Sequence, residues 1–203
     1  GAVKVYLDVI AKDKANYEVY FELYGQYCYS GQNDAANELL GQLLELKPDK
    51  AEDWMAVGRA YYLKKDYDKA KECFDTAYQG KCIEGKYYSG VVYAEEKSYK
   101  EAEEAFQTYI KENKDTLKIE VYSRLAAVYM EQRDFDKAQG AIDQGLSHGN
   151  SSAVQDLRRI QVVLFEKQNK YGEALSAAKE YYKIYPSDDA MQKEISFIKT
   201  RIK

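Results

Sequence analysis

The chain has 203 residues, of which 30 are Lys or Arg and 34 are Asp or Glu, so its formal net charge is −4. This balance argues against a nucleic-acid partner, because proteins that bind nucleic acid are expected to carry a basic stripe. An apolar run of about 18 residues is absent, so the sequence predicts no membrane-spanning segment.

The first predicted element is an amphipathic helix at Ala2–Lys14. Its apolar residues recur at helical spacing, as expected when one face packs against a neighbour. Ala2 and Tyr6 occupy the positions at which the downstream helix pairs place a small and an aromatic residue. We therefore interpret residues 1–16 as the second helix of a pair whose first helix is absent.

The next two segments, 17–50 and 51–82, each read as two short amphipathic helices around a turn. In segment 51–82 the first helix follows the pattern W-x2-L-G-x2-Y, with Val57 in place of the leucine, and the second helix follows A-x3-F. This combined pattern is the signature of the tetratricopeptide repeat, so the chain resembles that family. The residues that carry the resemblance are Trp54, Val57, Gly58, Tyr61, Ala70 and Phe74.

The same pattern continues towards the end of the chain. Segments 83–118, 119–154 and 155–186 repeat it, and residues 187–203 form one further predicted helix. The alanine of the second helix recurs as Ala36, Ala70, Ala102, Ala138 and Ala174. The resemblance implies an all-α, right-handed superhelical solenoid of antiparallel helix hairpins. It would be a single array over residues 1–203, with about five and a half repeats and a C-terminal capping helix.

The motifs expected of an enzyme or a metal site are missing. His148 is the only histidine, so neither a Ser-His-Asp triad nor a histidine-rich metal site can be assembled. A glycine-rich phosphate loop is absent as well. Cys28, Cys73 and Cys82 lack metal-type spacing, and we interpret them as small buried hydrophobes rather than disulfide partners. We expect no enzyme activity, no cofactor and no metal.

In the family, the first helices of successive repeats line a concave surface that binds protein or peptide ligands. Carried over to this sequence, that surface is acidic and aromatic, which suits a basic partner segment with apolar anchors. The alternative is that some of these side chains simply pack against the next repeat. The candidate residues are Glu18, Phe21, Glu22, Tyr29, Glu52, Met55, Arg59, Tyr62, Tyr87, Tyr88, Val91, Arg124 and Arg159.

Two of these candidates, Arg124 and Arg159, would suit a carboxylate of the ligand. However, Glu120 and Asp156 lie about one helical turn before them, and opposite charges at this spacing form ion pairs within a helix. Pairing within each helix is therefore the simpler interpretation.

Two other functions are compatible with the same pattern. One is a self-assembling structural module, which would form a homo-oligomer, and the other is a sensor that binds a small ligand or a signalling peptide. The Tyr-rich body and the segment YYKIYPSDDAMQKEISFIKTR are similar to the repeat regions of bacterial lipoproteins tethered outside the cell membrane. That similarity implies an extracytoplasmic, membrane-tethered protein, with a cytoplasmic location as the alternative.

Overall fold

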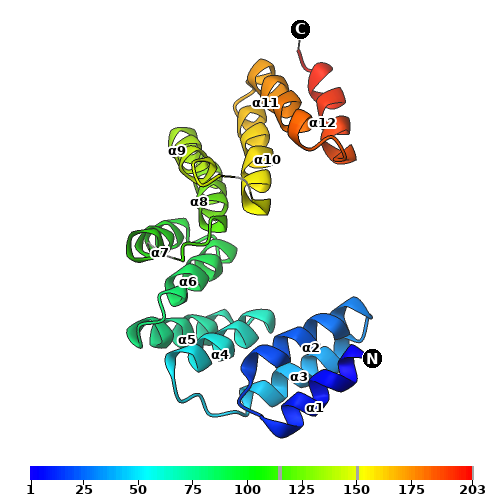
Figure 1. The fold of residues 1–203 in the computed structure, drawn as a ribbon. Coiled ribbons are helices and arrows are strands. Elements are labelled where there is room, and N and C mark those ends of the chain that lie inside the picture. The colour runs from blue at the N-terminus through cyan, green and yellow to red at the C-terminus, as the bar shows by residue number, and fades with distance from the viewer. Residues whose placement is uncertain (114–115, 150, 203) are drawn as a thin grey trace. The chain divides into compact units, whose positions relative to one another are not determined.

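A computed structural model describes residues 1–113, 116–149 and 151–202, and these residues form twelve α-helices and no strand. The helices belong to two compact units, Gly1–Glu96 and Lys97–Lys203, which we call unit 1 and unit 2. Figure 1 shows the order of the helices along the chain.

Unit 1 is built from helices that pack on their neighbours in the chain. Helix α1 contacts α2, the pairs α2/α3 and α4/α5 each form a hairpin, and α6 packs on α5. Helix α1 ends at Lys12, slightly before the predicted end at Lys14. The helices are α1 (Ala2–Lys12), α2 (Tyr17–Tyr29), α3 (Asn33–Leu44), α4 (Ala51–Leu63), α5 (Tyr67–Gln79) and α6 (Glu84–Glu95).

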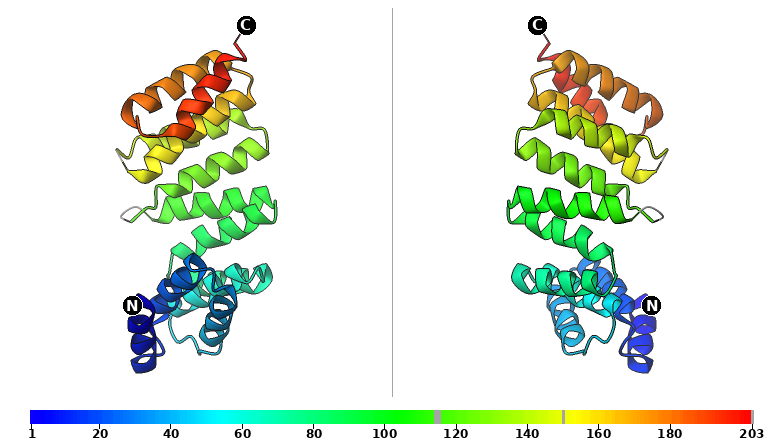
Figure 2. Two further views of the ribbon diagram at one scale, coloured as in Figure 1. Left: turned by 90° about the vertical axis from the view of Figure 1, so that its right-hand side faces the viewer. Right: turned by 90° about the vertical axis from the view of Figure 1, so that its left-hand side faces the viewer.

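Unit 2 follows the same scheme, and Figure 2 shows its helices stacked in chain order. Helix α10 begins at Ser152, within the stretch that the sequence assigns to the preceding repeat, because the Ser151 side chain accepts a hydrogen bond from the Val154 N–H. The helices are α7 (Tyr99–Glu112), α8 (Glu120–Glu131), α9 (Phe135–Leu146), α10 (Ser152–Lys167), α11 (Tyr171–Ile184) and α12 (Asp189–Lys199).

The hairpins are held together by close helix crossings at small residues. A Cβ atom added to Gly58 on α4 would lie only 2.5 Å from Cε1 of Phe74 on α5. A Cβ atom on Gly145 of α9 would lie 2.9 Å from the Tyr122 Cβ on α8. The predicted crossing at Gly58 is therefore confirmed. The recurring alanines of the second helices are all buried, namely Ala36, Ala70, Ala102, Ala138 and Ala174.

The turn inside each hairpin contains one residue in the left-handed conformation. After α4, for example, Lys65 has a φ of 61°, while the N–H groups of Lys65 and Asp66 donate to the carbonyls of Tyr62 and Tyr61. This is a Schellman motif, which satisfies the last carbonyls of a helix. The equivalent residues are Gly31, Lys65, Lys97, Arg133 and Asn169.

The cysteines differ in their surroundings, and the three of them are free thiols. Cys73 is buried, which raises the pKa of its thiol to about 11 and leaves it unreactive at neutral pH. Cys28 is exposed at the end of α2, so the prediction that all three are buried is wrong for this residue. Cys28 faces solvent because the packed face of α2 consists of Tyr17, Tyr20 and Leu23.

Candidate functional site

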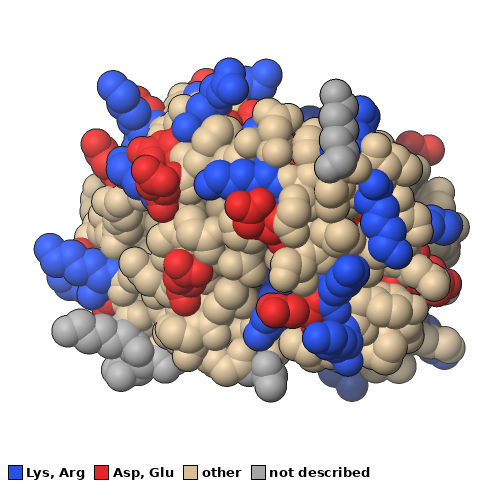
Figure 3. Space-filling model, turned by 90° about the horizontal axis from the view of Figure 1, so that it is seen from above, with Lys and Arg blue, Asp and Glu red and all other residues tan. Residues whose placement is uncertain are grey.

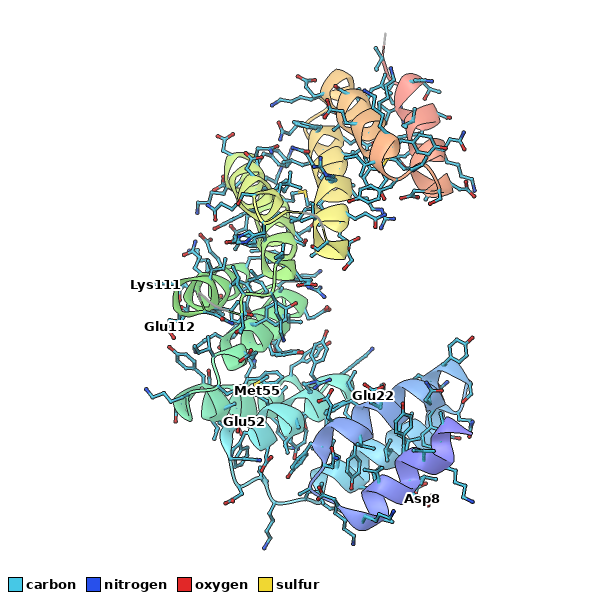
Figure 4. All side chains as sticks on the ribbon, viewed as in Figure 1. Asp8, Glu22, Glu52, Met55, Lys111 and Glu112 are labelled. Carbon is cyan, nitrogen blue, oxygen red and sulfur yellow. The ribbon has the colours of Figure 1, made fainter. Side chains whose placement is uncertain are left out.

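The candidate ligand residues lie on the first helix of each predicted repeat, and within each unit we call the surface of these helices the first-helix face. Figure 4 labels Glu22 on α2 together with Glu52 and Met55 on α4. Within unit 1 the candidates are Glu18, Phe21, Glu22 and Tyr29 on α2, Glu52, Met55, Arg59 and Tyr62 on α4, and Tyr87, Tyr88 and Val91 on α6. Within unit 2 they are Arg124 on α8 and Arg159 on α10.

Three candidates of unit 1 form one cluster across α2 and α4. The Nη1 atom of Arg59 lies 3.2 Å from Oε2 of Glu18, and its guanidinium carbon lies 3.9 Å from the centroid of the Phe21 ring. The ion pair is solvent-exposed and therefore weak, while the cation–π contact adds a second partner for the same side chain. The charge of Arg59 is thus offset inside the protein.

The apolar candidates divide into buried and accessible side chains. Met55, Tyr87 and Val91 are buried, so the alternative of packing inside the protein applies to these three. Tyr88 is half-buried and stacks on Phe74, with 5.4 Å between the ring centroids. Phe21 and Tyr62 are also half-buried, and Tyr29 is 92% exposed at the end of α2. The aromatic part of the first-helix face is therefore smaller than the sequence suggests.

The acids of the same face in unit 1 are exposed. Glu22 and Glu52 have no ion-pair partner among the residues that the structure describes. Since the cluster described above already uses Arg59 and Glu18, these two carboxylates remain as the uncompensated charges of α2 and α4. They would attract a cationic group from solution.

Arg159 in unit 2 is held by two acids. Its Nη1 atom lies 3.1 Å from Oδ1 of Asp156, which confirms the predicted pair within α10, and its Nη2 atom lies 2.8 Å from Oδ2 of Asp188. The Tyr181 hydroxyl also donates a hydrogen bond to Asp188. These bonds from Tyr181 and Arg159 lower the pKa of Asp188 to about 2. Arg159 therefore serves the structure. Arg124 is exposed on α8 and forms no ion pair among the described residues, so the predicted pair with Glu120 is wrong.

Asp188 also begins the last helix. Its Oδ1 atom accepts hydrogen bonds from the N–H groups of Ala190 and Met191, at 3.1 Å each. Asp188 is thus the N-cap of α12. One carboxylate joins α10, α11 and the start of α12, because it binds Arg159, Tyr181 and the helix N-terminus together.

A groove of about 180 Å³ lies between α10 and α12. Its apolar wall includes Met191 and Val163, and the latter is 42% exposed. Two carboxyl groups line the same groove, Glu166 from α10 and Glu194 from α12. Burial and the hydrogen bond that the protonated Glu166 donates to Glu194 raise the pKa of Glu166 to about 7. A hydrogen bond between two carboxyl groups requires one proton, so this carboxyl pair retains a proton close to neutral pH.

Glu194 was not recognised from the sequence as part of a site. Val163 and Glu166 lie on α10, the first helix of the last predicted repeat, whereas the sequence assigns residues 187–203 only a capping role. The available signal was the apolar stripe of α12, because Met191, Ile195 and Ile198 are buried and thereby orient the helix. Glu194 directly precedes Ile195, so its position beside the buried stripe follows from that orientation.

Metal-ligand clusters, the histidine, surface charge and helix length bear on other classes of function. Among residues 1–113, 116–149 and 151–202 there is no group of His, Cys, Asp or Glu side chains arranged to hold a metal ion. His148 is exposed, as predicted, with its ring 5.4 Å from that of Tyr122. On the face seen in Figure 3, basic and acidic side chains are interspersed. No described helix is both long enough and apolar enough to cross a membrane.

Comparisons with known proteins agree with the helix pattern. Residues 51–79 and 93–159 match the tetratricopeptide repeat family. No curated protein sequence matches the chain. The matched segments carry the repeat signature on both sides of the boundary between unit 1 and unit 2.

Solved structures show the same fold. PilW, a type IV pilus biogenesis factor, is 17% identical with a TM-score of 0.74, and the match covers 94% of this chain and 87% of PilW. TTC0263 of Thermus thermophilus is 17% identical with a TM-score of 0.67, covering 90% and 98%. YrrB, described as having an unusual peptide-binding site, is 16% identical with a TM-score of 0.59, covering 95% and 98%. The predicted all-α solenoid fold is confirmed.

Proposed function

Because this chain is a tetratricopeptide repeat protein, we propose that it is a non-catalytic scaffold that binds a partner segment with Lys or Arg between apolar residues, on its first helices and in the groove between α10 and α12. Proteins of this fold bind other proteins in general, and the charge of the surface indicates which class of partner segment would bind here. Exposed carboxylates on the first helices form no ion pair with a described residue, whereas Arg59 and Arg159 already form ion pairs. Such a surface favours a cationic ligand.

The observation that carries the proposal is the carboxyl pair in the groove between α10 and α12. Within the described part of the chain neither Glu166 nor Glu194 forms an ion pair, although Arg159 lines the same groove, because Arg159 is bound to Asp188 and Asp156. A Lys side chain would lay its methylene groups along Val163 and Met191, as long charged side chains do on apolar surface. Its ammonium group would then take the place of the shared proton.

The first-helix face of unit 1 would make contacts of a related kind. The Phe21 ring already holds the Arg59 guanidinium. Tyr62 and Tyr88 are half-buried, and an aromatic face attracts a cation by about 0.5–1 kcal/mol at exposed sites. Glu22 and Glu52 would guide a basic segment to α2 and α4. A peptide ligand also has a parallel among proteins of this fold, since YrrB is described as having a peptide-binding site.

The experiment compares two peptides by titration calorimetry, acetyl-Leu-Lys-Phe-Lys-Leu-amide and its counterpart with Glu in place of Lys. We expect the Lys peptide to bind and the Glu peptide to bind at least about tenfold more weakly at low salt. Glu166→Gln should weaken the Lys peptide, whereas Glu180→Gln on the exposed surface of α11 is the matched control. Equal affinity for both peptides would contradict the proposal.

Self-assembly is the second candidate function, and one observation favours it. On α1, which has no buried residue, Val5 is 60% exposed and Leu7 is 45% exposed. Val5 and Leu7 point to different sides of α1, because residues two apart on a helix do not share a face. A second copy that packs along α1 would cover at least the more exposed of the two, Val5. A second copy of the chain would be the occupant in this case.

A further inference from the structure

Unit 2 contains a larger hollow that lies apart from the groove between α10 and α12. It has a volume of about 410 Å³ and is lined by α7, α8 and α9. Its floor is apolar, with Ile110 from α7, Leu125 from α8 and Ala141 from α9. Sites for small ligands or single anchoring side chains usually span roughly 300–1,000 Å³, so this hollow is large enough for one side chain and its neighbour.

The charged side chains that line the hollow are both lysines, although the whole chain carries a net charge of −4. The Nζ atom of Lys137 lies 3.1 Å from Oε1 of Glu103, so its charge is largely offset. Lys111, labelled at the end of α7 in Figure 4, has no ion-pair partner within the described part of the chain. The rim of the hollow therefore presents one uncompensated positive charge.

Polar groups at the edge are already ordered by the protein. The Gln107 amide donates hydrogen bonds to the Tyr129 hydroxyl at 3.0 Å and to Glu103 at 3.2 Å. This network fixes the Tyr129 ring beside the hollow without closing it. A ligand would find the polar rim pre-arranged, which lowers the entropy lost on binding.

Gly140 keeps the hollow open on the side of α9. A Cβ atom there would meet nothing within 4 Å, so packing does not require a glycine. Glycine inside a helix costs about 1 kcal/mol relative to alanine. A larger side chain at this position would project into the hollow, which makes Gly140 a place to block it without disturbing the core.

We propose that this hollow binds an acidic segment of a partner protein, which inserts one apolar side chain onto Ile110 and Leu125 and places a carboxylate against Lys111. The apolar side chain would supply most of the affinity, because a buried anchor dominates such interfaces. The carboxylate would select the partner by charge. This second site prefers the opposite charge to the first-helix face and stands independently of it.

The test uses fluorescence anisotropy with labelled Glu-Leu-Phe-Glu-amide and its charge-reversed partner Lys-Leu-Phe-Lys-amide. The acidic peptide should bind, and Gly140→Leu should weaken it by roughly tenfold or more by filling the hollow. The matched control is Gly41→Leu on α3, where a Cβ atom also meets nothing. Both variants should remain folded by circular dichroism, since each replaces a helix-interior glycine by a better helix former.

Charge is tested by Lys111→Glu, with Lys179→Glu on the exposed surface of α11 as its control. Only Lys111→Glu should weaken the acidic peptide, and it should also reduce the salt dependence of binding. The proposal is overturned if the acidic peptide fails to bind the unaltered protein at millimolar concentration, or if Gly140→Leu binds it as well as Gly41→Leu does. Binding of acetyl-Leu-Lys-Phe-Lys-Leu-amide, which reports on the proposed function, should be unaffected by Gly140→Leu.

Discussion

Glu166 on α10 and Glu194 on α12 line the same groove, where burial and the hydrogen bond that the protonated Glu166 donates to Glu194 raise the pKa of Glu166 to about 7. Such a bond holds only while one of the two is protonated. The terminal helix is therefore attached to α10 by a contact that depends on pH, in addition to the bonds of Asp188 with Arg159 and Tyr181.

The first prediction concerns stability against pH. The pKa of Glu166 is raised to about 7, whereas an unfolded Glu titrates near 4.5. A group with a raised pKa stabilises the folded state fully below its unfolded pKa, and this contribution is lost as pH rises through the folded value. We expect unfolding free energy to fall between about pH 5 and about pH 8, by on the order of 1 kcal/mol because solvent screens the partly exposed pair.

Urea unfolding at both pH values measures this effect. Glu166→Gln should remove most of the pH dependence, whereas Glu180→Gln should retain it. Asp188 does not interfere in this window, since its pKa is lowered to about 2 and its contribution is lost only in stronger acid. An unfolding free energy that rises from pH 5 to pH 8 in the unaltered protein would contradict the carboxyl pair.

The second prediction concerns the turns within the hairpins. Lys65 and Lys97 have φ values of 61° and 60°, a conformation that glycine adopts without strain and other residues do at a cost of about 1 kcal/mol. Lys65→Gly and Lys97→Gly should each raise the unfolding free energy by roughly 0.5–1 kcal/mol. Gly31→Ala should lower it by a similar amount, and thermal unfolding would reveal all three shifts. Stabilisation by Gly31→Ala would be inconsistent with the left-handed turn.

The third prediction separates two glycines within α-helices of unit 1. Gly58→Ala places a methyl group 2.5 Å from the Phe74 ring, so we expect a loss of about 1–3 kcal/mol through overpacking. Gly41→Ala meets no atom within 4 Å and should instead stabilise α3 by roughly 0.5–1 kcal/mol. Denaturant titration of both variants gives the comparison. Equal effects of the two changes would mean that α4 and α5 do not cross at Gly58.

The fourth prediction tests self-assembly through α1. If a second copy covers Val5, the protein should be a dimer or larger in light scattering, and Val5→Asp should return it to a monomer. A matched control is Ile184→Asp, since Ile184 is also an exposed apolar residue and does not line the groove between α10 and α12. A monomer at high protein concentration would argue against this function and leave the scaffold proposal unaffected.

The helices and their crossings could be predicted because the responsible residues recur at a fixed spacing. Gly58, Ala70 and Phe74 identify a close crossing from the sequence alone, and the structure places them in one. The left-handed turn residues were harder to predict, because Lys65, Lys97 and Arg133 are not residues that favour this conformation. The turn is imposed there by the helices on either side.

The surface was less predictable than the fold. Position in the repeat cannot tell whether an aromatic ring faces solvent or the adjacent helix, and so Met55, Tyr87 and Val91 are buried although they occupy ligand-facing positions in the family pattern. Glu194 comes from the terminal helix, for which the repeat pattern gives no ligand positions. The contacts of Arg59 with Glu18 and Phe21 could not be predicted either, because these two residues lie in a different repeat.

The central claim is that a basic side chain of the partner replaces the proton shared by Glu166 and Glu194. Titration calorimetry of the lysine peptide at about pH 6, in two buffers with different ionisation enthalpies, counts the protons released on binding. We predict release of nearly one proton per peptide bound, less at about pH 8, and almost none with Glu166→Gln. Binding with the same enthalpy in both buffers, and with unchanged affinity for Glu166→Gln, would contradict the account.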